Sequence, residues 1–358
     1  MPISARLKAE APPAVQAIRR ARRERPGARL LVTGCAAEIE RDAIAAMPEV
    51  DGLVANAAKL DPRAWNAGEP AAPASSTHSR GFIAVQNGCN HACTFCIIPQ
   101  GRGASRSLAV VDVLRAVEAD LARGAGEIVL TGVDLTSWGA DLPNTPRLGS
   151  LVDAILGAFP TLHRLRLSSV DGIEIDSLLE DLIAGDERVM PHLHLSLQHG
   201  HDLILKRMKR RHLRADAISL VRRLRSRRPD IAIGADLIAG FPTETEAHHA
   251  ANLSIVEELQ IVHGHVFPYS PRPGTAASRM PQVAQPAVRE RAAELRAAIA
   301  SLRDAWLRSL VGRPLAVLAE RDGTGHASNF ARVRLPEGVH PGQIVTISPT
   351  HIDKGLLA

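Results

Sequence analysis

The stretch Cys89-Asn-His-Ala-Cys93-Thr-Phe-Cys96 decides how the chain is interpreted. It places three thiols within eight residues, spaced CxxxCxxC, directly after an apolar run at Phe82–Gln86. Three thiolates on one loop hold three irons of a [4Fe–4S] cluster and leave the fourth iron open for a non-protein ligand. Zinc is the alternative, with His91 as a fourth ligand, but this spacing after a strand in an α/β chain favours the iron–sulfur cluster.

Strands and helices alternate around this loop, from Gly81 to about Ser270. Each expected strand is a short run, and the six are Phe82–Gln86, Glu127–Thr131, Arg164–Ser168, His192–Leu197, Ile231–Ile238 and His263–Pro268. Helical patterns, such as those at Val110–Arg123 and Asp216–Arg225, separate them. This order predicts an α/β fold with a parallel sheet and right-handed crossovers, open or rolled into a partial barrel. The loops after such strands form one functional rim, where the cysteine loop is expected.

Two further regions flank the alternating core. Before it, residues 10–60 are expected to form an α/β unit whose strand ends at Gly34-Cys35, and the Pro-, Ala- and Ser-rich segment Asn66–Arg80 is expected to be a linker. After it, a helix at Gln285–Leu310 precedes short alternating strands at Leu315–Glu320, Ala331–Leu335 and Ile344–Ile347. This change of pattern predicts a small β-barrel, a type that often binds nucleic acid.

The composition is that of a globular chain. Its 358 residues are 45% hydrophobic and 23% charged, which excludes wholesale disorder and a fibrous architecture. No apolar run reaches the ~18 residues of a transmembrane helix, and the first residues lack the apolar stretch of a signal peptide. We therefore expect a cytoplasmic protein with no membrane partner, whose four cysteines are reduced rather than joined in disulfides.

Positive charge is concentrated in one segment. Between Lys206 and Arg228 eleven basic residues stand against one acid, whereas the whole chain has a net charge of only +5. A solvated helix surface is one explanation of such a run. Its position after the fourth strand favours binding to RNA phosphates instead, and the predicted RNA contacts are Lys206, Arg207, Lys209, Arg210 and Arg211, with Arg332 in the C-terminal barrel. Phe330 is expected to stack on a base.

The cysteine motif resembles that of the radical SAM superfamily, in which an aromatic residue, here Phe95, precedes the last cysteine. The resemblance extends to the methylthiotransferase family through the runs Leu31–Cys35, Glu127–Val133, Arg166–Asp171, His192–Gln198, Gly234–Pro242 and Phe267–Gly274. Within that family the chain is most similar to the tRNA enzymes that act on N6-threonylcarbamoyladenosine beside the anticodon.

The resemblance implies three domains. They are a partial methylthiotransferase N-terminal domain at 1–70, a radical SAM core at 75–305 built as a partial (β/α)6 barrel, and a TRAM-like RNA-binding domain at 306–358. It also implies radical methylthiolation of carbon 2 of the modified adenosine, with [4Fe–4S] clusters and S-adenosylmethionine as cofactors. The implied partners are tRNA and a reductant such as flavodoxin or ferredoxin.

The resemblance assigns roles to individual residues. Cys89, Cys93 and Cys96 become the cluster ligands. The residues implied to bind S-adenosylmethionine are Phe95 on its adenine side, Thr131 and Gly132 near its amino group, and Ser168 and Gln198 at later strand ends. The alternative is structural, since glycines at strand ends are often turn residues and serines often cap helices.

The chain departs from the family in two places. The family's N-terminal domain uses three cysteines for a second cluster, and this chain has only Cys35, which alone cannot hold one. We expect either an upstream extension or a truncated gene. His199 and His201 stand where the family has serines. The alternatives are an RNA-binding remnant with one cluster, or a methylthiotransferase for another adenosine or a ribosomal protein.

Overall fold

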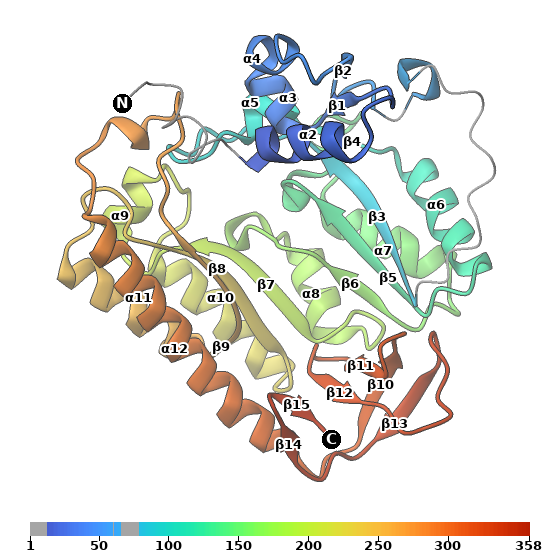
Figure 1. Ribbon diagram of the computed structural model, residues 1–358. Coiled ribbons are helices and arrows are strands. Elements are labelled where there is room, and N and C mark those ends of the chain that lie inside the picture. The colour runs from blue at the N-terminus through green and yellow to red at the C-terminus, as the bar shows by residue number, and fades with distance from the viewer. Residues whose placement is uncertain (1–12, 60, 66–78) are drawn as a thin grey trace. The chain divides into compact units, whose positions relative to one another are not determined.

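The computed structural model describes residues 13–59, 61–65 and 79–358 (Figure 1). They fall into two compact units, which are described separately. The first takes the chain up to residue 74 together with Ile97–Ala104, and the second takes the rest. Most of the segment expected to be a linker, Asn66–Arg80, lies outside the described residues, as do Met1–Lys8.

The first unit is a small α/β structure, as the sequence predicts. Two short parallel strands, β1 (Leu31–Thr33) and β2 (Gly52–Val54), lie at its centre. Its helices are α2 (Pro13–Glu24), α3 (Cys35–Ile39), α4 (Arg41–Ala45), the 3-10 helix η1 (Pro62–Trp65) and α5 (Ile98–Arg102). The strand β1 ends at the turn that bears Cys35, again as expected.

The second unit contains two sheets of mostly parallel strands. The first has the order β4-β3-β5-β6 and the second has the order β7-β8-β9. Isolated bridges at Leu165–Val189 and Val170–Leu195 connect them. The strands are β3 (Arg80–Asn87), the antiparallel β4 (Arg106–Ser107), β5 (Glu127–Gly132), β6 (Leu165–Leu167), β7 (His192–Gln198), β8 (Ala232–Ala239) and β9 (Ile261–Pro268). The six predicted strands are therefore confirmed.

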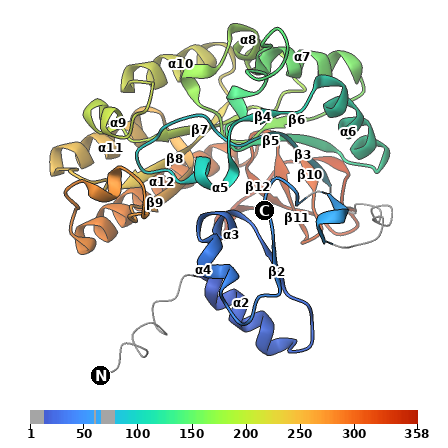
Figure 2. The same ribbon diagram turned by 90° about the horizontal axis from the view of Figure 1, so that it is seen from above.

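Helices follow the strands and lie along the outer side of the arc that the strands form (Figure 2). The α-helices of this unit are α6 (Val110–Ala122), α7 (Leu148–Ala158), α8 (Ser177–Gly185), α9 (Asp202–Arg207), α10 (Arg214–Arg227), α11 (Glu246–Glu258) and α12 (Gln285–Leu310). Its 3-10 helices are η2 (Leu135–Ser137), η3 (Gly172–Glu174) and η4 (Ala277–Arg279). The residue before α8 explains where that helix begins, because the Asp176 side chain accepts the Leu179 amide and caps the helix. The helix α12 runs across the expected domain boundary at 305/306.

The strands divide their side chains between two faces. On β7, Leu193, Leu195 and Leu197 belong to the main hydrophobic core with the helices. Because side chains alternate along a strand, His192 and His194 lie on the opposite face, which we call the inner face. On β7 the inner face is therefore polar.

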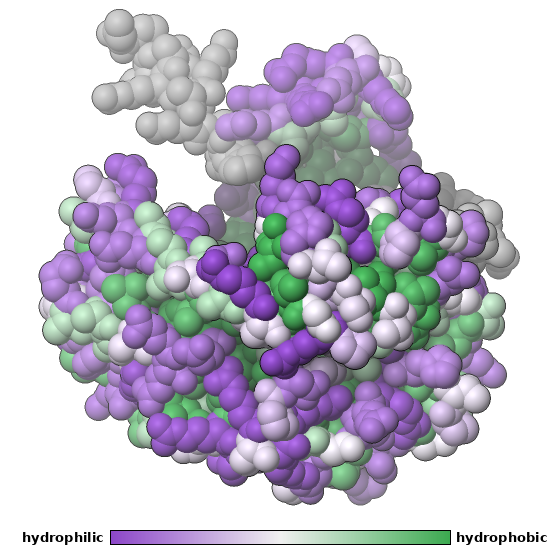
Figure 3. Space-filling model, turned by 90° about the horizontal axis from the view of Figure 1, so that it is seen from below, coloured by the Kyte–Doolittle hydropathy of each residue, from purple (hydrophilic) through white to green (hydrophobic). Residues whose placement is uncertain are grey.

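The C-terminal residues form a six-stranded sheet with the order β13-β10-β11-β12-β15-β14. Its strands are β10 (Leu315–Ala319), β11 (Thr324–Ala327), β12 (Arg332–Arg334), β13 (Ile344–Ile347), β14 (Ile352–Asp353) and β15 (Leu356–Leu357). The expected strands are confirmed, but a closed barrel is not: within the described chain the outer strands β13 and β14 do not pair. In the space-filling view from below, hydrophobic side chains form patches broken up by hydrophilic ones (Figure 3).

A buried charge cluster joins the C-terminal sheet to the strands. Glu127, which is fully buried, lies within 3.1 Å of Arg80, Arg164 and Arg166. Arg80 also pairs with Glu320 of the C-terminal region at 2.8 Å. Several coupled charges therefore hold the two parts together.

The ring of Phe330 is also part of this junction. It stacks between His192 and His326, with centroid distances of 4.8 and 4.6 Å. This overturns the expectation that Phe330 stacks on an RNA base, because its ring packs inside the protein. The described residues contain no helix that is long and apolar enough to cross a membrane.

Candidate cluster and cofactor site

Three half-buried cysteines lie on the loop that follows β3. The strand ends at Asn87, and Gly88, with a φ of 77°, turns the chain into the loop that carries Cys89, Cys93 and Cys96. None of the four cysteines of the chain is in a disulfide. The donor set is therefore three thiols on one strand-end loop, which fits a [4Fe–4S] cluster with one open iron.

Thr94 anchors this loop to the segment after α9. Its amide donates to the Met208 carbonyl at 3.1 Å, and its hydroxyl donates to the Arg207 carbonyl at 2.8 Å. Within the loop, the Cys96 amide donates to the Cys93 carbonyl at 3.1 Å. The basic segment thus supports the cysteine loop through its backbone.

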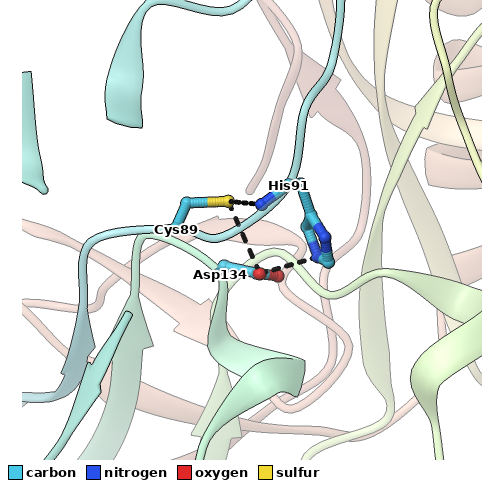
Figure 4. A group of neighbouring side chains, drawn as sticks. All are labelled: Cys89, His91 and Asp134. Atoms are coloured by element: carbon cyan, nitrogen blue, oxygen red, sulfur yellow. Dashed lines mark hydrogen bonds and ion pairs between the residues drawn. The ribbon is translucent and has the colours of Figure 1, made fainter. Parts of the chain in front are cut away.

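Cys89 lies beside an acid and an imidazole (Figure 4). Its Sγ is 3.6 Å from Asp134 Oδ2 and accepts the His91 amide at 3.4 Å, and His91 Nε2 is 2.8 Å from the same carboxylate oxygen. Burial, with the charge of Asp134 nearby, raises the pKa of the Cys89 thiol to about 12. Hydrogen bonds to Asp134 and Glu174 raise the pKa of His91 to about 10. Iron binding must therefore displace a proton from Cys89.

Arg210 reaches the cysteine loop from the basic segment. Its Nη1 donates to Cys93 Sγ at 3.7 Å, and its Nη2 donates to Asp171 Oδ2 and to the Ser196 carbonyl, both at 2.8 Å. The side chain is only 8% exposed. The structure therefore buries Arg210 against the cysteine loop, whereas the sequence predicted an RNA contact.

The other predicted RNA contacts differ in exposure. Lys206 and Lys209 are exposed, and no ion pair holds either one in the part of the chain that the structure describes. The remaining three are hydrogen-bonded within the protein: Arg207 to Thr243 at 2.7 Å, Arg211 to Glu174 at 2.7 Å and Arg332 to Asp322 at 2.5 Å.

Thr131 and Gly132 end β5 beside the cysteine loop. The Thr131 hydroxyl donates to the Ile83 carbonyl at 3.2 Å. A Cβ on Gly132 would lie 3.0 Å from Gln86 Oε1, so close packing explains the glycine. Gln86 Oε1 also accepts the Asp134 amide at 2.8 Å, and Gln86 therefore connects two rim loops.

Ser168, Gln198 and Phe95 lie at three further positions near the rim. The hydroxyl of Ser168 is buried and has no hydrogen-bond partner among the described residues. Because buried hydroxyls normally have a partner, this one is available to bind a ligand. Gln198 ends β7 with a φ of 71°, a conformation that non-glycine residues rarely adopt. Phe95 contacts Phe241 edge-on at a centroid distance of 6.5 Å.

The two histidines that depart from the family have structural partners. His199 is fully buried, and its Nε2 lies 3.2 Å from Glu244 Oε2. His201 accepts the Leu203 amide at 3.2 Å and caps α9. Both make local contacts that explain their presence, and neither joins the cysteine loop.

In the first unit, Cys35 lies at the N-terminus of α3, after Gly34 with its φ of 106°. Arg102 Nε donates to its Sγ at 3.2 Å. The backbone approaches closely here, because a Cβ on Gly101 would lie 2.9 Å from the Cβ of Cys35. A lone thiol beside a guanidinium is not a ligand set for a second [4Fe–4S] cluster.

Three acidic residues of the site were missed from the sequence: Asp134, Asp171 and Glu174. Each follows a predicted strand by a few residues, so position at the rim was the signal that could have found them. Their pairing with His91 and with the arginines depends on contacts between segments about 40 residues apart, such as Arg210 with Asp171. A sequence pattern does not report such contacts.

Comparison with known proteins gives consistent matches. Residues 83–253 match the model of the radical SAM superfamily. The chain is 40% identical to a threonylcarbamoyladenosine tRNA methylthiotransferase, MtaB, of Rickettsia prowazekii (strain Madrid E), over 96% of this chain and 85% of that protein. It is 34% identical to a tRNA-2-methylthio-N(6)-dimethylallyladenosine synthase of Paracoccus denitrificans (strain Pd 1222), over 84% of this chain and 72% of that protein.

A further relative with the same printed name, from Parafrankia sp. (strain EAN1pec), is 36% identical over 79% of this chain and 57% of that protein. Among solved structures, the chain is similar to the radical S-adenosylmethionine methyltransferase TsrM of Kitasatospora setae. That likeness has a TM-score of 0.45 at 20% identity and covers 55% of this chain and 38% of the other.

Proposed function

The chain belongs to the radical SAM family of tRNA methylthiotransferases, and from this premise we propose that it adds a methylthio group to carbon 2 of N6-threonylcarbamoyladenosine in tRNA. The observation that carries the proposal is the triple-cysteine loop at the end of β3, with the unpaired Ser168 hydroxyl at a neighbouring strand end. The choice of nucleoside follows the relative that matches 96% of this chain.

As a member of this family, the protein uses a [4Fe–4S] cluster and S-adenosylmethionine. Cys89, Cys93 and Cys96 would hold the cluster, and Phe95, Thr131, Gly132, Ser168 and Gln198 would line the cofactor pocket. When bound, these groups supply the one-electron chemistry that removes a hydrogen atom from an aromatic carbon, which no side chain can do by acid–base chemistry.

The chain's own residues orient this chemistry. Thr94 fixes the cysteine loop, and Gln86 fixes the neighbouring loop at Asp134. Arg210 brings a positive charge to Cys93 and is held there by Asp171. A guanidinium so placed would stabilise the negative charge that a cluster adds to this loop.

For tRNA, we propose that Lys206 and Lys209 bind phosphates, because both are exposed beside the cysteine loop. We further propose that the sheet at 306–358 is a TRAM-like RNA-binding domain after a core at 75–305 and a partial domain at 1–70. The reductant would be flavodoxin or ferredoxin in the cytoplasm, since the cluster must receive an electron from outside the chain.

A second candidate rests on Cys35. Because this unit contributes one thiol to a second cluster, the chain could be an RNA-binding protein that holds one cluster and performs no thiolation. The names of other relatives also favour a third candidate, in which the substrate carries a dimethylallyl group.

Anaerobic reconstitution followed by nucleoside mass spectrometry tests these candidates. The chain, S-adenosylmethionine and a reductant are incubated with tRNA that carries N6-threonylcarbamoyladenosine, and Cys93→Ala serves as the matched control. We expect the methylthio nucleoside with the wild type alone. Cleavage of S-adenosylmethionine without any methylthio nucleoside, at about four irons per chain, would establish the second candidate instead.

A further inference from the structure

Three polar side chains form a group on the inner face, one from each of β7, β8 and β9. His194 Nε2 lies 3.1 Å from Asp236 Oδ1, and His265 Nδ1 lies 3.0 Å from the same oxygen. We call His194, Asp236 and His265 the His–Asp–His group. Neither the cluster nor the proposed phosphate contacts use it, so its function is unassigned.

The strand register places this group just inside the rim. Gln198 of β7 pairs with Leu237, and the next residue inward on β8, Asp236, pairs with His265. One residue along a strand is about 3.3 Å. The group therefore lies one residue below the level of Gln198, which the sequence assigns to the cofactor pocket.

The His–Asp–His group is covered by buried residues on one side and is exposed on the other. His192 and His263, further along the same face, are buried against Phe330, and burial lowers the pKa of both, so both are neutral. The side chain of His265, in contrast, is 67% exposed, that of Asp236 is 19% exposed and that of His194 is 8% exposed. His265 is therefore the most accessible member of the group.

Two polar atoms of the group remain available to a ligand. Among the described residues, none hydrogen-bonds to His265 Nε2 or to Asp236 Oδ2, because both histidines use Oδ1. Although burial opposes it, the hydrogen bond from His194 keeps the pKa of Asp236 below its ordinary value, so the carboxylate is charged. Phe267, which is exposed, lies edge-on to His265 at a centroid distance of 6.4 Å.

These atoms suit a polar substituent on the substrate base, which we call its arm. A threonylcarbamoyl group has N–H and hydroxyl donors, which Asp236 Oδ2 and His265 Nε2 can accept. A dimethylallyl group has no polar atom and would make no hydrogen bond to His265 Nε2 or Asp236 Oδ2, so this site favours the polar arm.

We propose that His265, positioned by Asp236 and His194, binds the threonylcarbamoyl arm of the substrate nucleoside and selects it over an apolar arm. This inference rests on the proposed function and adds the residues that read the substrate. His265 is the specificity-determining residue, and Asp236 is both a contact and the group that fixes the imidazole.

The same three side chains could instead bind a divalent cation, since their ligand atoms lie within 4.8 Å of one another. The geometry favours the arm. Both imidazoles are at hydrogen-bond distance from a single carboxylate oxygen, so the group is satisfied without a metal ion.

The experiment compares two tRNA substrates, one with N6-threonylcarbamoyladenosine and one with N6-dimethylallyladenosine. The reconstituted wild type, His265→Phe and His265→Gln are assayed for kcat/KM on each. His163→Phe, which replaces an exposed histidine of the loop before β6, is the matched control. Formation of 5′-deoxyadenosine without tRNA reports whether the cluster and cofactor site are intact in every variant.

We expect His265→Phe to lower kcat/KM on the threonylcarbamoyl substrate by about 10- to 100-fold, mainly through KM. The ratio of the two substrates should shift toward dimethylallyl, His265→Gln should restore part of the loss, and 5′-deoxyadenosine formation should not change. An unchanged substrate ratio in His265→Phe overturns the inference and leaves the proposed function standing. A wild type that modifies only the dimethylallyl substrate overturns the proposed function itself.

A measurement of bound zinc tests the alternative that the His–Asp–His group binds a divalent cation. The chain with all three loop cysteines replaced by alanine is dialysed against Zn²⁺ and then against buffer. We expect no zinc to stay bound. One zinc per chain that is lost on His265→Phe would replace the proposed arm contact with a metal site.

Discussion

Arg210 places its Nη1 3.7 Å from the sulfur of Cys93, while Asp171 holds the other end of the guanidinium at 2.8 Å. A charge run that resembles a phosphate-binding surface thus supplies one arginine to the cluster loop. Arg210 is expected to affect cleavage of S-adenosylmethionine, whereas its exposed neighbours Lys206 and Lys209 are expected to affect tRNA binding. The two roles can therefore be measured separately.

Replacing Arg210 with alanine should impair the cluster chemistry and spare tRNA binding. Hydrogen bonds to charged groups contribute about 1.5–3 kcal/mol, which is roughly tenfold or more in rate. We expect 5′-deoxyadenosine formation to fall by about that factor, and filter binding of tRNA to stay within twofold. Loss of tRNA affinity with normal cleavage of S-adenosylmethionine would instead show that Arg210 binds tRNA.

The double variant Lys206→Ala/Lys209→Ala should show the opposite behaviour. Each phosphate contact that is lost reduces the slope of log affinity against log salt by about one. We expect a slope lower by about two and unchanged 5′-deoxyadenosine formation. Arg115→Ala on α6 removes an exposed charge elsewhere and controls for net charge; an equal effect of this variant would contradict a specific site.

Cys93→Ala should abolish cluster binding at the loop. Two remaining thiols cannot hold the cluster, so anaerobically reconstituted protein should lose nearly all its iron and all 5′-deoxyadenosine formation. Cys35→Ala is the matched control and should keep about four irons per chain. If Cys35→Ala removes as much iron as Cys93→Ala, the assignment of the ligands is wrong.

Ser168→Ala separates a ligand contact from a structural one. Since the buried hydroxyl has no partner among the described residues, its removal should not lower the free energy of unfolding. We expect the KM for S-adenosylmethionine to rise by about three- to tenfold, which corresponds to one lost hydrogen bond. Isothermal titration with S-adenosylmethionine and a urea unfolding curve measure the two effects, and destabilisation without a change in binding would contradict the assignment.

Glu127→Gln should destabilise the second unit by about 3–5 kcal/mol, because it leaves Arg164 and Arg166 buried without their counter-charge. Although burial opposes it, Arg166 and Arg164 lower the pKa of Glu127 below its ordinary value of 4.5.

The stabilisation by Glu127 is therefore present above about pH 4.5 and is lost as the pH falls through the lowered value. Urea unfolding from pH 7 downward should show this loss in the wild type and a flatter profile in Glu127→Gln. Glu257→Gln, at an exposed position of α11, should change neither.

The sequence was sufficient for the local elements and the cysteine loop. The strands of the core repeat apolar residues with a period that identifies them, and the CxxxCxxC spacing predicts the cluster ligands, which stays a prediction. What could not be predicted depends on distant pairing. Arg210 was assigned to RNA because its partner Asp171 lies 39 residues away. Phe330 was assigned to a base because the histidines that enclose it come from other elements.

The C-terminal sheet shows the same limit. Alternating apolar residues predicted its strands, but closure of a barrel depends on whether the first and last strands of the sheet meet. In the described chain they do not, and the sheet ends at β13 and β14. The His–Asp–His group was also invisible beforehand, since it needs the register of three strands to bring its members together.

The Glu127 cluster also indicates that the C-terminal sheet is not an independent module. Arg80 is shared between Glu127 and Glu320, and Phe330 fills the space between His192 and His326, so the C-terminal sheet is integrated with the strands of the core. Cutting the chain after Leu310 would remove Glu320, the partner of Arg80, and Phe330, the ring that covers His192 and His263. We therefore expect a chain cut at this point to be less stable than the intact one.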